Sequence, residues 1–115
     1  MTRNHLFAIL WTLGILAACS IPGKDLPTLH IASADKIAHF AIFAGFGWLW
    51  MRAFPDKPAG STGYVLAFGL AYGALTEVYQ GLLPFGRSPD PYDALANALG
   101  LLTAVLVYRL VKRAA

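Results

Sequence analysis

Four long apolar runs separated by short polar breaks dominate the hydropathy pattern of this chain. They cover about residues 6–21, 37–54, 64–83 and 94–111, and they lack the strict alternation of apolar and polar residues that is typical of a β-strand. A helix needs about 20 residues to cross the hydrocarbon core of a bilayer, with about 17 as the lower limit. The last three runs are therefore long enough to span a membrane as helices, and the first is marginal.

The breaks between the runs contain prolines and glycines that end helices. Pro22 and Gly23 follow the first run, residues 55–60 hold two prolines and a glycine, and residues 84–91 hold three prolines. Proline in a helix interior removes a backbone hydrogen bond and clashes with the preceding turn, so we expect loops here. The predicted fold is all-α, with a single domain over residues 1–115 that contains four helices and three loops.

Composition places these predicted helices in a membrane. Of the residues, 57% are hydrophobic and 13% are charged, and the mean hydropathy is +0.57. Soluble domains carry about 25% charged residues, so we expect an integral membrane bundle. The net charge of +3 and the pI of about 9.2 come from basic residues beside the apolar runs, which favours a role in topology over nucleic-acid binding.

Lys and Arg are distributed unevenly between the two ends of the predicted bundle. The end that includes both termini carries six of them: Arg3, Arg52, Lys57, Arg109, Lys112 and Arg113. The opposite end carries three: Lys24, Lys36 and Arg87. Because cytoplasmic loops are enriched in basic residues, we expect both termini to face the cytoplasm.

The first run has an alternative interpretation as a lipoprotein signal. The sequence Leu16-Ala17-Ala18-Cys19 resembles a lipoprotein cleavage site, and Arg3 precedes its short hydrophobic region. Cleavage there would lipidate Cys19 and remove the first helix from the bundle. Otherwise Cys19 is a small apolar residue in a spanning helix.

Polar residues that are costly in a bilayer gather near the end opposite to the termini. An ionisable residue at the centre of a spanning helix costs about 2.5 to 3.5 kcal/mol, so such residues are functional candidates by default. Residues three or four apart on a helix share a face, which applies to Asp35 with His39, Glu77 with Gln80, and Asp93 with Asn97. Lys36 lies beside the first pair, and Arg87 and Ser88 lie in the last loop. We therefore expect one shared pocket.

Structural explanations exist for most of these residues. Asp35 and Asp93 can cap the N-termini of their helices. The imidazole and amide side chains can hydrogen-bond neighbouring helices, and the loop arginine can contact lipid phosphate. Glu77 is the hardest to explain in this way, because a buried carboxylate needs a partner or must take up a proton.

Five segments together resemble the VanZ-like family. They are S-I-P-G at 20–23, D-K-I-A-H-F at 35–40, Y-G-A-L-T-E-V-Y-Q at 72–80, P-F-G-R-S at 84–88 and D-A-L-A-N-A-L-G at 93–100. The resemblance covers essentially the whole chain, and its serine and proline at the end of the first run disfavour lipoprotein cleavage. It implies a small multi-pass protein of the bacterial inner membrane, named for a member associated with teicoplanin resistance. The resemblance implies a fold and the position of a site, but it does not imply a particular reaction.

The first functional hypothesis is a pocket, open away from the cytoplasm, that binds the polar part of a membrane lipid or a lipid-linked envelope precursor. Lys36 and Arg87 would hold a phosphate or carboxylate. If the pocket also processes its ligand, His39 would be the general acid or base, oriented by Asp35 and exchanging protons with Glu77. The remaining ligand-binding residues would be Gln80, Ser88, Asp93 and Asn97.

A second hypothesis is a non-catalytic accessory protein whose polar cluster stabilises the bundle or docks a membrane-protein partner or a second copy. Close helix contacts would use four glycines: Gly45, Gly47, Gly69 and Gly73. Metal binding is a third alternative, in which His39, Glu77 and Asp93 supply one imidazole and two carboxylates. No H-x-x-x-H pair supports it, so no metal and no other cofactor is expected.

Overall fold

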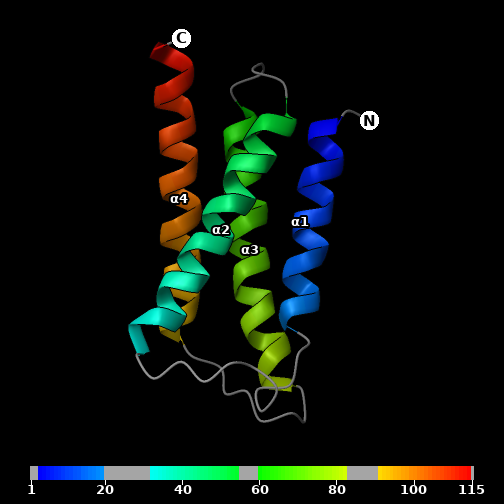
Figure 1. Cartoon of the computed structure of the whole chain (residues 1–115), viewed down its shortest axis with the longest axis vertical. Helices are drawn as coiled ribbons and strands as arrows, with labels where there is room; N and C mark the ends of the chain where they lie inside the picture. Colours follow the sequence, from blue (N-terminus) through cyan, green and yellow to red (C-terminus); the bar gives the residue numbers. More distant parts are fainter. Residues whose placement is uncertain (1–2, 20–31, 55–59, 83–90, 115) are drawn as a thin grey trace.

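The computed structural model describes residues 3–19, 32–54, 60–82 and 91–114. Within these ranges the chain forms four α-helices and no strand (Figure 1): α1 (Arg3–Cys19), α2 (Ala32–Ala53), α3 (Gly60–Leu82) and α4 (Pro91–Ala114). Consecutive helices run in opposite directions, so both ends of the chain lie at the same end of the bundle. The prediction of an all-α fold with four helices is confirmed.

All four helices begin earlier than the apolar runs predicted, at residues 3, 32, 60 and 91 rather than at about 6, 37, 64 and 94. α2 begins at Ala32 rather than at residue 37, so Asp35 lies inside the helix. An N-cap residue precedes the first helical residue, and the interpretation of Asp35 as the cap of α2 is therefore wrong. α4 begins at Pro91, a residue type that is tolerated at the first helical position, and Asp93 lies in its first turn rather than before it. The helix dipole favours a negative charge at that position.

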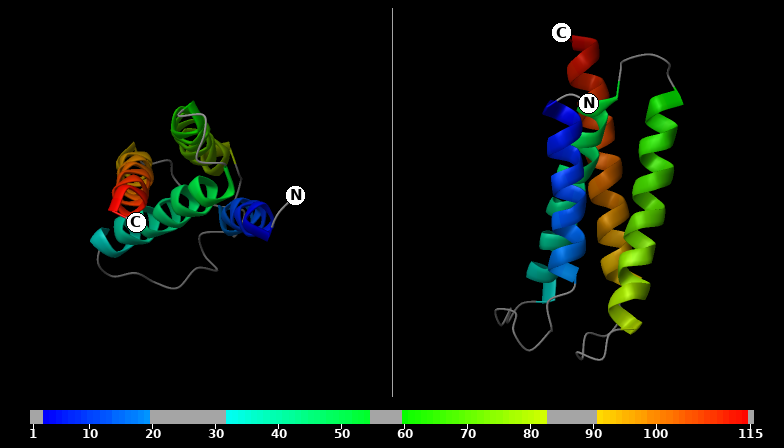
Figure 2. Two further views of the ribbon diagram at one scale, coloured as in Figure 1. Left: turned by 90° about the horizontal axis from the view of Figure 1, so that it is seen from above. Right: turned by 90° about the vertical axis from the view of Figure 1, so that its right-hand side faces the viewer.

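α2 is the central helix of the bundle. It packs most extensively against α4 and also contacts α1 and α3, as the view along the bundle shows (Figure 2). The buried core includes Phe46 of α2, Val65 of α3 and Leu101 of α4. The ring of Phe46 stacks on that of Tyr72, with centroids 5.7 Å apart. This aromatic contact joins α2 to α3, and Leu101 brings α4 to the same core.

α2 and α4 approach each other closely at Gly100. A Cβ atom added at Gly100 would lie 2.1 Å from the backbone oxygen of Phe40. The two helices therefore meet backbone against backbone here, as small residues allow at helix interfaces. The contact lies three residues beyond Asn97, so it also sets the separation of α2 and α4 at the polar residues.

α1 is joined to the bundle by hydrogen bonds around Thr12. The indole nitrogen of Trp50 donates to Thr12 Oγ1 at 2.9 Å, and the hydroxyl of Tyr72 donates to the Thr12 carbonyl at 2.6 Å. In turn, Thr12 Oγ1 donates to the Ala8 carbonyl at 2.8 Å. One residue of α1 thus contacts both α2 and α3 through polar groups.

We expect Thr12→Val to lower stability by about 1 kcal/mol, because it keeps the shape of the side chain but removes the acceptor for Trp50. Thermal unfolding followed by circular dichroism in detergent measures this loss. The matched control is Thr103→Val, since Thr103 is exposed and donates only within α4, to the Leu99 carbonyl at 2.7 Å. Equal melting temperatures for the two variants would contradict this role of Thr12.

Large apolar side chains cover the outer surface of the helices, for example Leu13 on α1, Leu75 on α3 and Leu106 on α4. Judged by length and composition, one helix in the described part of the chain, Pro91–Lys112, is long and apolar enough to cross a membrane. The described part of α1 is apolar but shorter, from Arg3 to Ala18. The four predicted helices are therefore present, while four membrane crossings with cytoplasmic termini stay a prediction.

Candidate functional site

Polar residues from three helices meet at the end of the bundle that lies away from the termini. The start of α2 contributes Lys36 and His39, the end of α3 contributes Glu77 and Gln80, and the start of α4 contributes Asp93 and Asn97. We call these six residues the polar cluster. Its four members on α3 and α4 are buried, although nearly all other buried side chains in the described core are apolar.

Two residues of α2 contact two residues of α4 within the polar cluster. Lys36 Nζ forms an ion pair with Asp93 Oδ1 at 2.5 Å. His39 lies on the same face of α2, with Nδ1 2.9 Å from Asn97 Oδ1 and Nε2 3.6 Å from Asp93 Oδ2. Spacings of three and four residues place each pair on one helical face, so the contacts form together.

The hydrogen bond to Asn97 determines which nitrogen of His39 faces the carboxylates. An amide oxygen only accepts hydrogen bonds, so His39 Nδ1 carries the proton and donates it to Asn97 Oδ1. His39 Nε2 is then directed toward Asp93. In the neutral ring this nitrogen bears the lone pair, the group through which an imidazole accepts a proton or binds a cation.

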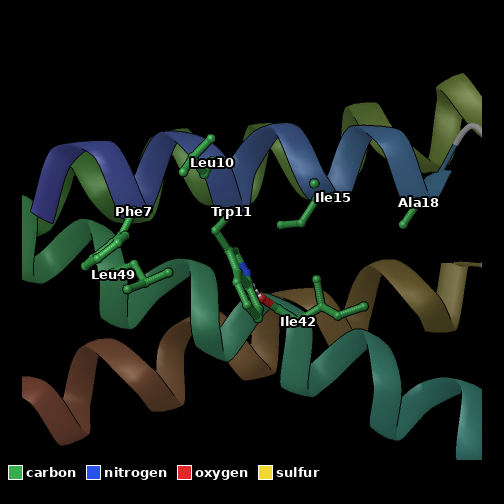
Figure 3. A pocket seen from close by; sticks show the side chains of 8 residues that line it. Phe7, Leu10, Trp11, Ile15, Ala18, Ile42 and Leu49 are labelled. Atoms are coloured by element: carbon green, nitrogen blue, oxygen red, sulfur yellow. Dashed lines mark hydrogen bonds between the residues drawn. The ribbon is translucent and has the colours of Figure 1, made fainter. Parts of the chain in front are cut away.

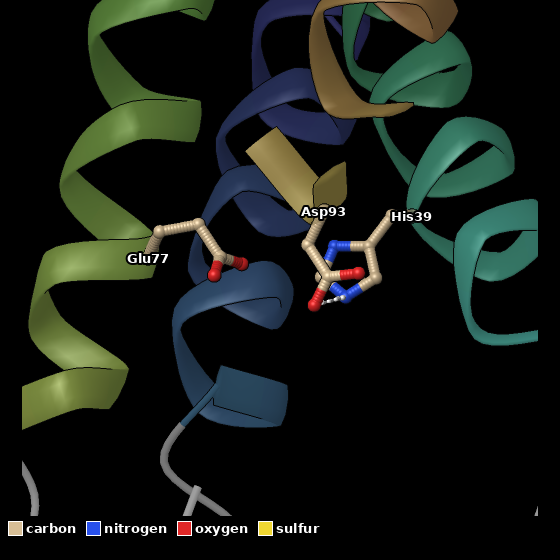
Figure 4. A group of neighbouring side chains, drawn as sticks. All are labelled: His39, Glu77 and Asp93. Carbon is tan, nitrogen blue, oxygen red and sulfur yellow. Dashed lines mark ion pairs between the residues drawn. The ribbon is translucent and has the colours of Figure 1, made fainter. Parts of the chain in front are cut away.

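Glu77 completes the polar cluster from the side of α3. Its carboxylate extends from α3 toward the facing side chains of His39 and Asp93 (Figure 4). One ligand-type atom from each of the three residues lies within 4.8 Å of the other two. Glu77 is only 7% exposed, so this carboxylate sits among protein groups rather than in bulk water.

The amide oxygen of Asn97 accepts a hydrogen bond from His39, whereas the amide nitrogen makes none with the described residues. The side chain is 2% exposed, and Nδ2 has no hydrogen-bond partner among the described residues. A Cβ built on Gly73 would lie 3.6 Å from this nitrogen. Gly73 precedes Glu77 by four residues, so Nδ2 faces the side of α3 that also carries Glu77. The unused donor thus lies between helices, close to the carboxylates.

The structure brings together five of the predicted site residues: Lys36, His39, Glu77, Asp93 and Asn97. Gln80 is buried one turn beyond Glu77. Asp35 lies within α2, and its side chain is outside the described part of the structure, as are residues Arg87 and Ser88.

Two further residues shape this end of α3. Thr76 is buried and donates its hydroxyl hydrogen to the Gly73 carbonyl at 2.8 Å, which satisfies it within the helix. The sequence analysis assigned Gly73 to close helix packing and gave Thr76 no role of its own, although both lie in the family segment at residues 72–80. The other sequence signal for Thr76 is a hydroxyl residue directly before Glu77 in an apolar run.

A separate cavity of about 640 Å³ lies between α1 and α2 and has an apolar lining (Figure 3). Phe7 and Ile15 of α1 face Ile42 and Leu49 of α2 across it, and Leu10 also lines it. The indole nitrogen of Trp11 is already satisfied, because it donates to the Ile42 carbonyl at 2.9 Å. Ionisable chemistry is therefore found in the polar cluster and not in this cavity.

All six residues of the polar cluster lie in the stretch of the chain that a family model matches. The VanZ/LLP1 family model matches residues 2–112. The chain belongs to the VanZ/LLP1 family. This match confirms the resemblance inferred from the five sequence segments. The matched region of the VanZ/LLP1 chain contains all of α1, α2 and α3, and α4 up to Lys112. No curated protein and no solved structure matches this VanZ/LLP1 chain.

Proposed function

We propose that this VanZ/LLP1 protein is a four-helix membrane bundle whose polar cluster binds the polar headgroup of a cell-envelope lipid or lipid-linked precursor. The observation that carries the proposal is the burial of Glu77, Asp93 and Asn97, from two helices, against His39 of a third. Such residues are expensive in an apolar bundle, and their concentration at one end favours a binding site.

Surface composition supports the membrane part of the proposal. Soluble proteins rarely expose continuous apolar surface, whereas each of the helices here carries exposed leucines or other large apolar residues. The basic residues of the described helices at the end with the termini are Arg3, Arg52, Arg109, Lys112 and Arg113. Lys36 lies at the opposite end. This asymmetry favours cytoplasmic termini and a polar cluster that faces away from the cytoplasm.

Lys36 and Asn97 are suited to an anionic headgroup. The Lys36 side chain is 32% exposed, so its ammonium group can reach a phosphate or carboxylate at the rim while it remains close to Asp93. Deeper in the cluster, Asn97 Nδ2 offers a donor that no described residue uses. A headgroup oxygen would satisfy this donor, which is otherwise costly to bury. If the ligand is also processed, His39 Nε2 is the group that would move a proton.

The alternative is a non-catalytic accessory protein, and the contacts between α2 and α4 favour it specifically. The Lys36–Asp93 ion pair and the His39–Asn97 hydrogen bond join the two helices directly. In this alternative their whole role is to stabilise the bundle or present a surface to a partner. The two functions differ in whether changes to the cluster alter ligand retention or only stability.

Native mass spectrometry of protein extracted with its lipids tests the proposal. We expect the wild type to retain an anionic lipid, and Lys36→Gln and Arg87→Gln to retain it at least about ten-fold less, because each removes one cation. The matched control is Arg109→Gln, which removes a cation at the opposite end, where Arg109 donates to Thr62 Oγ1 at 2.7 Å.

Melting temperatures in detergent separate the two functions. Headgroup binding is supported if Lys36→Gln and Arg87→Gln both lose the lipid and at least Arg87→Gln keeps the melting temperature of the wild type. Equal retention in all variants, or equal loss in Arg109→Gln, overturns it. Full retention together with a lower melting temperature in Lys36→Gln favours the accessory function.

A further inference from the structure

Three side chains of the polar cluster are arranged as a set of metal ligands. His39, Glu77 and Asp93 come from three different helices, and one ligand-type atom of each lies within 4.8 Å of the others. Nitrogen and oxygen ligands bind zinc at about 2.0–2.2 Å, so two ligands in tetrahedral geometry are about 3.4 Å apart. The 3.6 Å between His39 Nε2 and Asp93 Oδ2 is close to that value. Starting from at most 4.8 Å, Glu77 needs to approach by no more than about 1.4 Å to complete the set.

The orientation of His39 is also that of a metal ligand. A ligating histidine usually donates its other ring N–H to a carbonyl or carboxylate, which fixes the ring and its tautomer. His39 Nδ1 donates to Asn97 Oδ1 at 2.9 Å, and this leaves Nε2 facing the carboxylates. Asp93 divides its two oxygens in a similar way, with Oδ1 on Lys36 and Oδ2 toward His39. His39 and Asp93 are thus each held by a second residue.

The unused donor on Asn97 is an independent observation that indicates a ligand. Nδ2 is buried without a hydrogen-bond partner among the described residues, on the side of α4 that faces Gly73 and hence the face of Glu77. A donor in that place needs an acceptor. A water or a headgroup oxygen bound to a cation between the three ligands would provide one.

We infer that His39, Glu77 and Asp93 bind a divalent transition-metal ion such as Zn²⁺ or Mn²⁺. One imidazole and two carboxylates suit such an ion better than Ca²⁺ or Mg²⁺, which prefer oxygen ligands throughout. Three protein ligands leave at least one coordination position open. That this position takes an oxygen of the headgroup rests on the proposed function, whereas metal binding itself does not. Sequence analysis named this set only as its third alternative and expected no metal, because the three ligands lie on separate helices and form no local ligand pair in the sequence.

Metal content and spectroscopy test the inference on the purified full-length chain. After incubation with Zn²⁺ and dialysis, we expect close to one ion per wild-type chain by mass spectrometry of the elements. His39→Ala and Glu77→Gln should weaken binding at least about 100-fold, and Asn97→Leu, which keeps all three ligands, by about 10- to 100-fold. Substitution with Co²⁺ should give visible absorption bands that shift in Glu77→Gln. The matched control is His5→Ala, at the other end of the bundle.

Each outcome decides between the proposals. Less than one tenth of an ion in the wild type, or unchanged binding in both His39→Ala and Glu77→Gln, overturns the metal site. Equal loss in His5→Ala does so as well, because it shows binding at scattered histidines. If a ligand variant fails to fold, the Co²⁺ spectrum of the wild type and the binding of Asn97→Leu still decide. If the protein binds metal but retains no lipid, the metal site is supported and the proposed function is overturned. If it retains lipid but binds no metal, the proposed function is supported and the metal site is overturned.

Discussion

Replacing Gly100 with alanine is expected to destabilise the bundle more than any other single methyl addition to its glycines. The added Cβ would lie 2.1 Å from the oxygen, 2.9 Å from the carbonyl carbon and 3.0 Å from the Cα of Phe40. These are backbone atoms of α2, so no side-chain rotation relieves the clash. Overpacking usually costs about 1–3 kcal/mol, and we expect at least about 3 kcal/mol here because the helices themselves must separate.

Thermal unfolding in detergent measures this effect against two matched variants. Gly14→Ala adds a methyl group where no atom lies within 4 Å, so it should be neutral or stabilise by up to about 1 kcal/mol through helix propensity. Gly69→Ala would meet Leu101 Cδ2 at 2.5 Å, but a leucine side chain can rotate, so its effect should lie between the other two. Similar melting temperatures for Gly14→Ala and Gly100→Ala would show that α2 and α4 do not touch through their backbones.

The fold was predictable because its physical determinants are local. Each apolar run is long enough for one helix, and prolines in the breaks prevent the helices from continuing. The bounds were less predictable. Reading α2 from its first large apolar residue, Ile37, placed its start too late, because the helix also includes the polar turn before it. The same error produced the wrong assignment of Asp35 as a cap.

For the candidate site, the sequence predicted only which polar residues share a face of one helix, not which residues contact each other between helices. Spacings within a helix showed that Glu77 and Gln80, or Asp93 and Asn97, share a face, and the antiparallel order placed these faces at one end. The sequence does not order the helices around the bundle, so it left open which residues pair. The contacts of Lys36 with Asp93 and of His39 with Asn97 depend on α2 lying directly against α4.

The polar residues that form the candidate site also make membrane-spanning helices difficult to recognise from hydropathy. Glu77 and Gln80 interrupt the apolar run of α3, and α2 includes Lys36 and His39 in its second turn. α4, whose acidic residue lies in its first turn, is the described helix that passes a strict test of length and composition. A polar site built from helix ends thus lowers the hydropathy of the helices that carry it.

The ion pair between Lys36 and Asp93 should respond asymmetrically to loss of either partner. Lys36→Met leaves the Asp93 carboxylate, whose side chain is 11% exposed, without its ammonium partner. Removing one member of a buried pair costs about 3–5 kcal/mol. We expect about 2 kcal/mol here, since Lys36 is partly exposed and Asp93 still has His39 3.6 Å away and the helix dipole of α4. Asp93→Asn should cost only about 1 kcal/mol, because the lysine can extend to water.

A double-mutant cycle with Lys36→Met, Asp93→Asn and the double variant measures the interaction free energy of this pair. Thermal or denaturant unfolding is recorded in the presence of a chelator, so that metal binding does not contribute. The double variant should be about as stable as Asp93→Asn alone, because once the carboxylate is neutral the lysine has no charge left to compensate. That result corresponds to a coupling free energy of about 2 kcal/mol, the cost of Lys36→Met alone. Strictly additive losses would mean that the two side chains do not interact, and α2 and α4 would then be held at this end by other contacts, among them the His39–Asn97 hydrogen bond and the Gly100 contact.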